Sequence, residues 1–164
     1  MNLRETVSVI MLTLLLTSML TTMLTLIFNI QTVKAEPGTI YIRADGSIDP
    51  PTANITTMDN VTYTITDHIF DCDSIVVERN NIIIDGGPYS LNGPGSQVRN
   101  STGIDLTGRN NVTVKSIEIN SFYYGVLLNE SHGNCIEENM VTNSAVGIKV
   151  RYSSNNTIFW NDIM

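Results

Sequence analysis

Positive charge is scarce in this chain, and so are charged residues of any kind. Charged residues make up 15% of the 164 positions, and nine Lys and Arg stand against 16 Asp and Glu, which gives a net charge of −7. Nucleic-acid binding depends on clustered basic residues that neutralise phosphates, so this composition excludes that class of partner. It also disfavours an anionic membrane surface and predicts repulsion of acidic polysaccharides, unless a local basic patch reverses it.

Long apolar runs are also few, and one at the start of the chain has a clear interpretation. Arg4 precedes an almost unbroken apolar run from Val7 to Ile30, and Val33 and Ala35 provide the small residues of a cleavage site. We predict a signal peptide over residues 1–35, removed after Ala35. The run is long enough to span a bilayer, so an uncleaved anchor is the alternative. In both cases the remainder is secreted or at the cell surface, and only this segment meets a membrane.

The rest of the chain repeats with a period of about 22 residues, which is within the range of stacked-repeat proteins. Gly103, Gly125 and Gly147 are equally spaced, and each begins a short segment in which apolar residues flank one variable residue. This two-residue alternation is typical of a strand with one buried face. The variable residues Asp105, Leu127 and Lys149 are therefore expected to point outward, stacked on one another.

Asparagines form a second landmark of the repeat. Asn81, Asn111, Asn134 and Asn156 are predicted to occupy sharp corners, because asparagine and glycine tolerate the left-handed backbone. The step from Asn134 to Asn156 equals that of the glycines, but the step from Asn111 to Asn134 is one position longer, so one coil is expected to absorb an extra residue. Stacked corners would let the amides bond to one another as a ladder.

These features predict an all-β fold, a right-handed parallel β-helix with about 22 residues per coil. Residues 36–78 lack the repeat and are predicted to form an N-terminal cap and first strands, and residues 79–164 form the repeats. No cap is visible at the C-terminal end, so further coils are expected beyond Met164. The step from Asn81 to Asn111 is longer than one coil, and we assign the excess of eight to the Gly- and Pro-rich segment 86–100. Insertions of this kind are often at the binding face.

The second half of the chain resembles a known group of proteins. The segments that carry the resemblance are 82–86 (IIIDG), 103–106 (GIDL), 110–114 (NNVTV), 124–126 (YGV) and 153–158 (SSNNTI). They resemble NosD-like periplasmic proteins and the carbohydrate-binding and sugar-hydrolase β-helices. The resemblance implies the fold and a contact with carbohydrate or the cell envelope, but it implies no particular chemistry.

Aromatic residues are the first candidates for such a contact. Tyr123, Tyr124 and Trp160 carry rings that can stack on a sugar and a polar group that can bond to it. Burial in the core or at a corner is the other interpretation, because alternation buries one residue of each neighbouring pair.

The sequence contains little that supports a catalytic function. His132 and Lys149 resemble short parts of polygalacturonase motifs, but glycoside hydrolysis needs two carboxylates that flank the bond. Asp105 and Glu118 each stand alone, so we predict no catalytic residue, and His132 is interpreted as a turn residue.

Metal binding is weakly indicated as well. Asp71 and Asp73 share a face of a strand and are the candidates for calcium, although a polar turn is the interpretation that the spacing favours. No cluster of Cys, His and Met suits copper, and no cofactor is predicted. Cys72 and Cys135 are separated by at least one coil, beyond the bonding range of about 7 Å between Cα atoms, so they are predicted to be unpaired thiols.

Six asparagines match the N-glycosylation sequon. They are Asn54, Asn60, Asn100, Asn111, Asn129 and Asn155. Some coincide with predicted corners, so a structural role without sugar is the alternative.

The function predicted from the sequence is that of an exported, non-catalytic repeat scaffold that contacts carbohydrate or the cell envelope. Two alternatives remain: a polysaccharide lyase or glycoside hydrolase whose catalytic coils lie beyond residue 164, and a NosD-like periplasmic accessory protein.

Overall fold

A computed structural model describes residues 2–28 and 38–164, and the chain divides into two compact units, Met1–Ala35 and Glu36–Met164. The first unit contains helix α1 (Leu3–Phe28). Asn2 and Glu5 form a reciprocal cap at its start, since each backbone N–H donates to the other's side chain at 3.0 Å. No helix in these described ranges is both long and apolar enough to cross a membrane. The predicted cleavage site after Ala35 lies outside the described residues.

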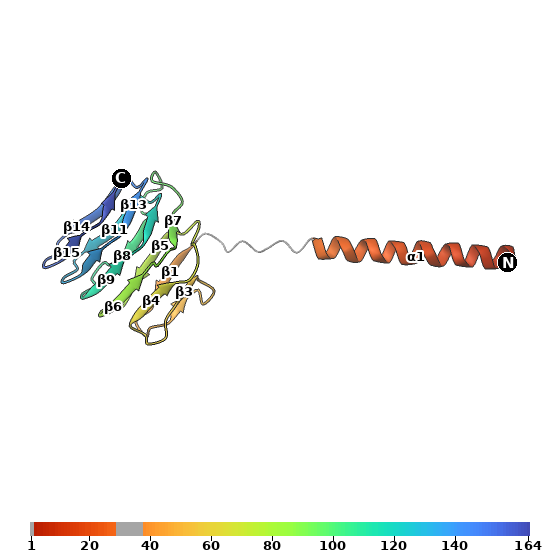
Figure 1. Cartoon of the computed structure of the whole chain (residues 1–164), viewed down its shortest axis with the longest axis horizontal. Coiled ribbons are helices and arrows are strands. Elements are labelled where there is room, and N and C mark those ends of the chain that lie inside the picture. Colours follow the sequence, from red (N-terminus) through yellow and green to blue (C-terminus); the bar gives the residue numbers. More distant parts are fainter. Residues whose placement is uncertain (1, 29–37) are drawn as a thin grey trace. The chain divides into compact units, whose positions relative to one another are not determined.

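The second unit consists of short strands in three sheets (Figure 1). Sheet A contains β1 (Thr39–Ile42), β2 (Ile48–Asp49), β5 (Ser74–Val77), β8 (Thr102–Asp105), β11 (Tyr124–Asn129) and β14 (Val146–Arg151). Sheet B contains β3 (Ile55–Thr56), β4 (Thr62–Ile65), β6 (Ile82–Asp85), β9 (Val112–Lys115), β12 (Cys135–Glu137) and β15 (Thr157–Phe159). Sheet C contains β7 (Ser90–Asn92), β10 (Glu118–Asn120), β13 (Met140–Thr142) and β16 (Asp162–Ile163).

From β5 onward the chain passes through sheets A, B and C in turn and then returns to sheet A. Within each sheet, a strand pairs in parallel with the strand one passage earlier, one passage later or both, as β11 does with β8 and β14. We call one passage a coil; the third, fourth and fifth coils are residues 102–123, 124–145 and 146–164. The fold is therefore mostly β with parallel sheets, as the repeat predicted.

The start of the unit differs from the repeats. Strands β1 and β4 pair in parallel with β5 and β6, so they lie in the same sheets as the repeat strands. Strands β2 and β3 pair antiparallel with β1 and β4 and cover their outer edges. Antiparallel edge strands of this kind prevent further strands from adding at that end.

The register confirms one prediction and corrects another. Leu127 pairs with Asp105 and with Lys149, so the three variable residues stack on successive coils. Cys135 pairs with Thr113 and with Thr157, which makes Val112 the equivalent of Asn134. The prediction of an extra residue between Asn111 and Asn134 is wrong, because these two asparagines occupy different positions of the coil.

The excess in the second coil lies in the Gly- and Pro-rich segment, in two parts. Asn81 and Asn111 are bonded across 30 residues, whereas Asn92 and Asn120 are bonded across 28 and later coils across 22. Two additional residues therefore lie in the turn between β6 and β7, and six lie in the loop between β7 and β8.

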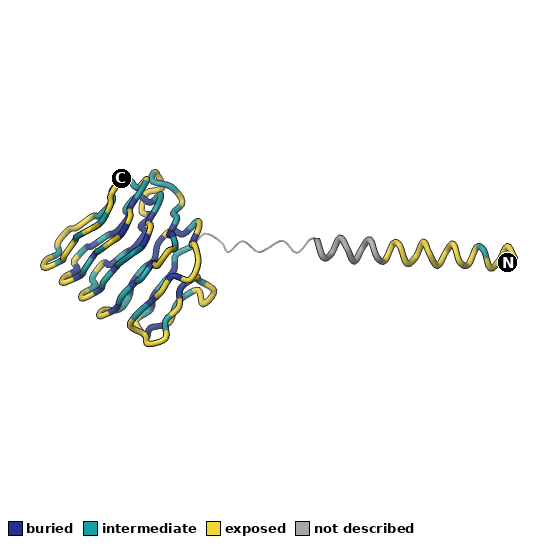
Figure 2. Tube along the Cα trace, in the orientation of Figure 1, coloured by how far each residue is buried: buried dark blue, intermediate teal, exposed yellow. Residues whose placement is uncertain are grey.

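The interior of the coils is apolar (Figure 2). Each strand turns alternate side chains inward, so Ile104, Val126 and Leu128 are fully buried while their neighbours face outward. In the fifth coil the equivalent of Leu128, Val150, is 43% exposed. The inward residues of β8 and β11 have a neighbouring strand on both sides, whereas Val150 has one on a single side.

The glycines that begin the repeated segments have a different role from the one expected at corners. Gly103, Gly125 and Gly147 are not left-handed. A Cβ on Gly125 would lie 2.5 Å from the carbonyl oxygen of Gly147 and 2.4 Å from Cγ1 of Val141. Glycine is required there because the next coil and the opposite sheet approach too closely for any side chain.

The predicted corner asparagines belong to two neighbouring rows. Asn81 and Asn111 are left-handed, as are Asn60, Gly133 and Asn155 at equivalent positions. Asn134 and Asn156 are one position further on and are not left-handed. Asn134 is 1% exposed, and its Oδ1 accepts a hydrogen bond of 2.9 Å from the Val112 N–H, while Oδ1 of Asn156 accepts one from the Asn134 N–H.

We predict that Gly125→Ala destabilises the protein by about 1–3 kcal/mol, because the added methyl overpacks the interior against backbone that cannot move away. The measurement is the free energy of unfolding in urea. The matched control is Gly133→Asn, since asparagine already occupies the same left-handed position at Asn111 and Asn155. Equal stability of the Gly125→Ala variant and the parent chain would contradict the packing.

We predict that Asn134→Ala also costs about 1–3 kcal/mol, because it leaves the buried Val112 N–H without an acceptor. The same unfolding measurement tests it. Asn143→Gly is the control: it also removes a bond between coils, but this amide is exposed, its acceptor, Asn120 Oδ1, keeps another donor in Thr142, and glycine tolerates the left-handed backbone of this position.

Candidate functional site

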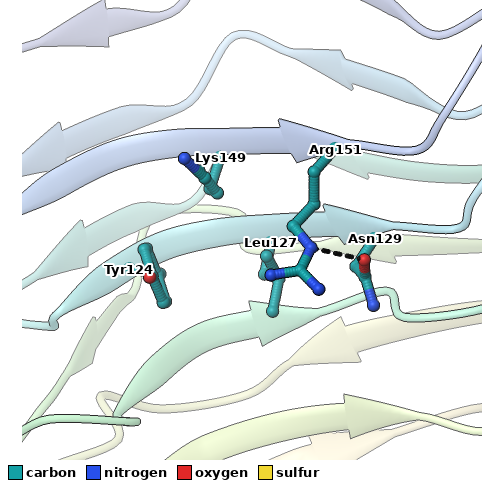
Figure 3. A pocket seen from close by; sticks show the side chains of 5 residues that line it. All are labelled: Tyr124, Leu127, Asn129, Lys149 and Arg151. Carbon is teal, nitrogen blue, oxygen red and sulfur yellow. Dashed lines mark hydrogen bonds between the residues drawn. The ribbon is translucent and has the colours of Figure 1, made fainter.

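A shallow depression lies on the outer face of sheet A (Figure 3). Its volume is about 140 Å³, and it is lined by outward side chains of the two last strands of the sheet. These are Tyr124, Leu127 and Asn129 of β11, and Lys149 and Arg151 of β14. The strand alternation that buries Val126 and Leu128 places this set outside, and the parallel register places the two strands side by side.

Arg151 is held in place by its neighbours. Its Nε–H donates to Oδ1 of Asn129 at 2.8 Å, and its guanidinium carbon lies 5.1 Å from the ring centroid of Tyr152. Within residues 38–164, no hydrogen bond engages its Nη1 and Nη2 groups. Four of its five N–H donors therefore remain available to a ligand.

Positive charge at the depression is uncompensated. Within the described part of the β unit, neither Lys149 nor Arg151 forms an ion pair. Elsewhere Arg43 pairs with Asp49 and Glu78, and Lys115 pairs with Asp85 at 2.9 Å. The pKa of Asp85 is lowered: burial, the largest single cause, raises it, but the hydrogen bond to Lys115, the bond from the Gly87 N–H and the charge of Lys115 together outweigh burial. The depression is thus a local basic patch on an acidic chain.

The predicted sugar-binding aromatics lie at two separate corners. Tyr123 and Tyr124 meet edge to face with centroids 4.7 Å apart, where the chain enters sheet A, and both are half-buried. Trp160 is 77% exposed on the turn between β15 and β16, against Phe159 at 5.1 Å. The structure therefore brings Tyr124 to the depression, with Tyr123 against its ring, and places Trp160 at the corner between sheets B and C.

A further aromatic group was not found from the sequence. The His68 ring lies 5.5 Å from Tyr89 and 6.1 Å from Phe70, which is exposed. The register of Ile69 with Leu91 brings these residues together on sheet C. Tyr89 belongs to the Gly- and Pro-rich segment, which was the available signal.

The carboxylates considered for catalysis face different directions. Asp105 is an outward residue of sheet A, and its Oδ1 accepts bonds from the N–H and hydroxyl of Thr107. Glu118 is an exposed residue of sheet C. His132 stands before β12, where its Nδ1 is paired with the Ser154 hydroxyl at 2.8 Å. These groups do not converge on one point.

The groups considered for metals are also dispersed. Asp71 is left-handed and Asp73 is exposed, on either side of the buried Cys72. Among the residues that the structure describes, no three His, Cys, Asp or Glu side chains come close enough to hold an ion. Calcium at Asp71 and Asp73 stays a prediction.

Both cysteines are free thiols, as predicted, but their environments differ. Cys72 is buried, and this burial raises the pKa of its thiol to about 11. Cys135 is half-buried on sheet B. The pKa of its thiol is raised mainly by this burial and, to a smaller extent, by the nearby Glu137 carboxylate. Neither thiol is therefore ionised near neutral pH.

The six sequon asparagines divide by environment. Asn54, Asn60, Asn100, Asn111 and Asn155 are exposed, and all but Asn54 are left-handed. Asn129 lies in the depression and accepts the bond from Arg151, and Ser131 of its sequon is fully buried. Glycosylation of the exposed five stays a prediction, whereas a glycan on Asn129 would fill the depression.

We predict that iodoacetamide at pH 8 modifies Cys135 much faster than Cys72 in the folded chain, because Cys72 is buried and protonated. Mass spectrometry of tryptic peptides measures both rates, and denaturant, which removes the difference, is the control.

Burial of Cys72 also predicts a pH dependence of stability. Because the pKa of the Cys72 thiol is about 11 in the folded chain and its ordinary value is 9.0, the contribution of this thiol to stability is present below about pH 9 and is lost as the pH rises to about 11. Cys72→Ala removes that pH-dependent part.

Comparison with known proteins found one family whose model matches the chain. The model of the family described as "Periplasmic copper-binding protein (NosD)" matches residues 26–164. No curated protein and no solved structure gave a match.

Proposed function

The chain belongs to the NosD family, and we propose that it is a non-catalytic, extracytoplasmic scaffold whose sheet A contacts carbohydrate of the cell envelope. The observation that carries the proposal is the depression on sheet A, in which Tyr124, Leu127 and Asn129 lie beside two basic side chains. A tyrosine beside polar groups is the combination with which proteins hold sugar rings. The periplasmic location named for the family supports a position outside the cytoplasm.

We propose further that the stacked coils form a right-handed parallel β-helix. The order of strands in sheets A, B and C supports stacking, since each sheet receives one strand from each passage of the chain. Right-handedness follows from the general rule that connections between parallel strands of a sheet are right-handed. Residues 1–35 would serve as the export signal, with cleavage after Ala35 or retention as an anchor.

Copper, named for the family, does not fit the described residues. A copper site draws on converging thiolate, thioether or imidazole ligands. Cys72 lies in the turn before β5, whereas Cys135 lies on β12 of sheet B, and among the described residues no three His, Cys, Asp or Glu side chains come close enough to hold an ion. We therefore assign no copper chemistry to this part of the chain.

Binding to immobilised glycans tests the proposal. We expect the full-length chain to bind at least one envelope polysaccharide in the presence of a chelator, and Tyr124→Ala to weaken that binding about tenfold through loss of ring contact. Trp160→Ala removes an exposed aromatic at the other corner and serves as the control, with unchanged affinity. Loss of binding with Trp160→Ala alone would place the contact elsewhere, and no binding to any glycan would refute the function.

A further inference from the structure

We propose that the depression on sheet A is a subsite for an acidic sugar unit, in which Arg151 and Lys149 bind the carboxylate of a uronate within a polysaccharide and Tyr124 contacts its ring. The proposal rests on the proposed function and names its ligand class. It reverses the expectation from overall charge, because a chain of net charge −7 would be expected to repel acidic polymers.

Charge is the first argument. Lys149 and Arg151 are adjacent outward residues of β14, and neither meets an acidic side chain in an ion pair among residues 38–164. The nearest carboxylate on the strands of their sheet, Asp105, stands two coils away, about 10 Å at the spacing of parallel strands, and its Oδ1 is already bonded to Thr107. At physiological ionic strength, where the Debye length is about 8 Å, the charge of Asp105 is largely screened. Glu130 follows β11 directly and its backbone N–H donates to the Arg151 carbonyl oxygen at 3.1 Å, but within residues 38–164 its exposed side chain pairs with neither basic group. The patch therefore attracts an anion.

The orientation of Arg151 is the second argument. The bond from Nε to Asn129 fixes the guanidinium across the two strands, and Figure 3 shows it reaching from β14 over Leu127 of β11. The unoccupied Nη1 and Nη2 groups form the fork that binds a carboxylate through two parallel hydrogen bonds. Because the fork is already held, less side-chain entropy is lost when the carboxylate binds.

The shape of the depression is the third argument. Its volume of about 140 Å³ is close to that of cavities that accept a six-membered ring, roughly 150 Å³. Tyr124 stands apart from Leu127 and from the guanidinium of Arg151 that reaches over it (Figure 3). A sugar placed between Tyr124 and the guanidinium would meet the tyrosine ring with its C–H groups and the guanidinium with its carboxylate.

The test compares two polymers that differ only in the carboxylate: polygalacturonate and its fully methyl-esterified form. The purified full-length chain is titrated with each polymer in a chelator, which removes bridging by calcium. We expect the acid to bind about tenfold or more tightly than the ester, and Arg151→Gln to remove about tenfold of the affinity for the acid while leaving the ester unchanged. Tyr124→Ala should weaken the binding of both polymers.

Lys115→Gln is the matched control, because it removes one positive charge from sheet B, where Lys115 is already paired with Asp85. Its affinity for the acid should equal that of the parent chain, and equal melting temperatures of all variants establish that they are folded. A loss as large as that of Arg151→Gln would show general attraction of a polyanion and overturn the proposal.

The remaining outcomes distinguish failure of the acidic subsite from failure of the proposed function. If both polymers bind equally and Arg151→Gln has no effect, the acidic subsite is wrong but carbohydrate contact stands. If the parent chain binds neither these polymers nor any neutral envelope glycan, the proposed function falls as well.

Discussion

Every strand of the repeated coils, from β5 onward, depends on a neighbouring coil for its backbone hydrogen bonds. The parallel ladders join each coil to the next, and buried asparagines extend the same bonding into the turns, as Asn134 does for Val112 and Asn139 for Ile117. A coil that differed in length at these positions would leave buried N–H groups without acceptors, at a cost of about 1–3 kcal/mol each. A constant coil length is the consequence, and additional residues are confined to turns such as those beside β7.

The same register assembles the depression on sheet A. Residues one coil apart become neighbours, so side chains of two coils act together, as Asn129 and Arg151 do through a bond of 2.8 Å. No loop or domain closure is needed to bring them together. The inward residues determine the fold, while the outward row passes from Asp105 through Leu127 to Lys149 without disturbing the core. Charge on this face can therefore vary independently of stability.

Membership of the NosD family and the absence of a fitting copper site in the described residues are compatible for this reason. The family model matches residues 26–164, which include every strand of the β unit. A shared fold does not imply a shared site, because function resides in particular side chains. In this chain those side chains offer hydrogen-bond donors and a tyrosine, and the thiols are buried or protonated.

The sequence by itself determined the strands, their inward and outward faces and the period, because alternation and spacing are local properties of the chain. It also placed the excess of the second coil in the Gly- and Pro-rich segment and identified Tyr124. Only the tertiary structure decided that Gly125 is required by close packing, that Asn134 aligns with Val112 rather than Asn111, and that Arg151 joins Asn129 and Tyr124 in one depression. Each of these features depends on which residues of neighbouring coils are in contact. Such contacts form only when the coils pack against one another, so the sequence of a single repeat does not reveal them.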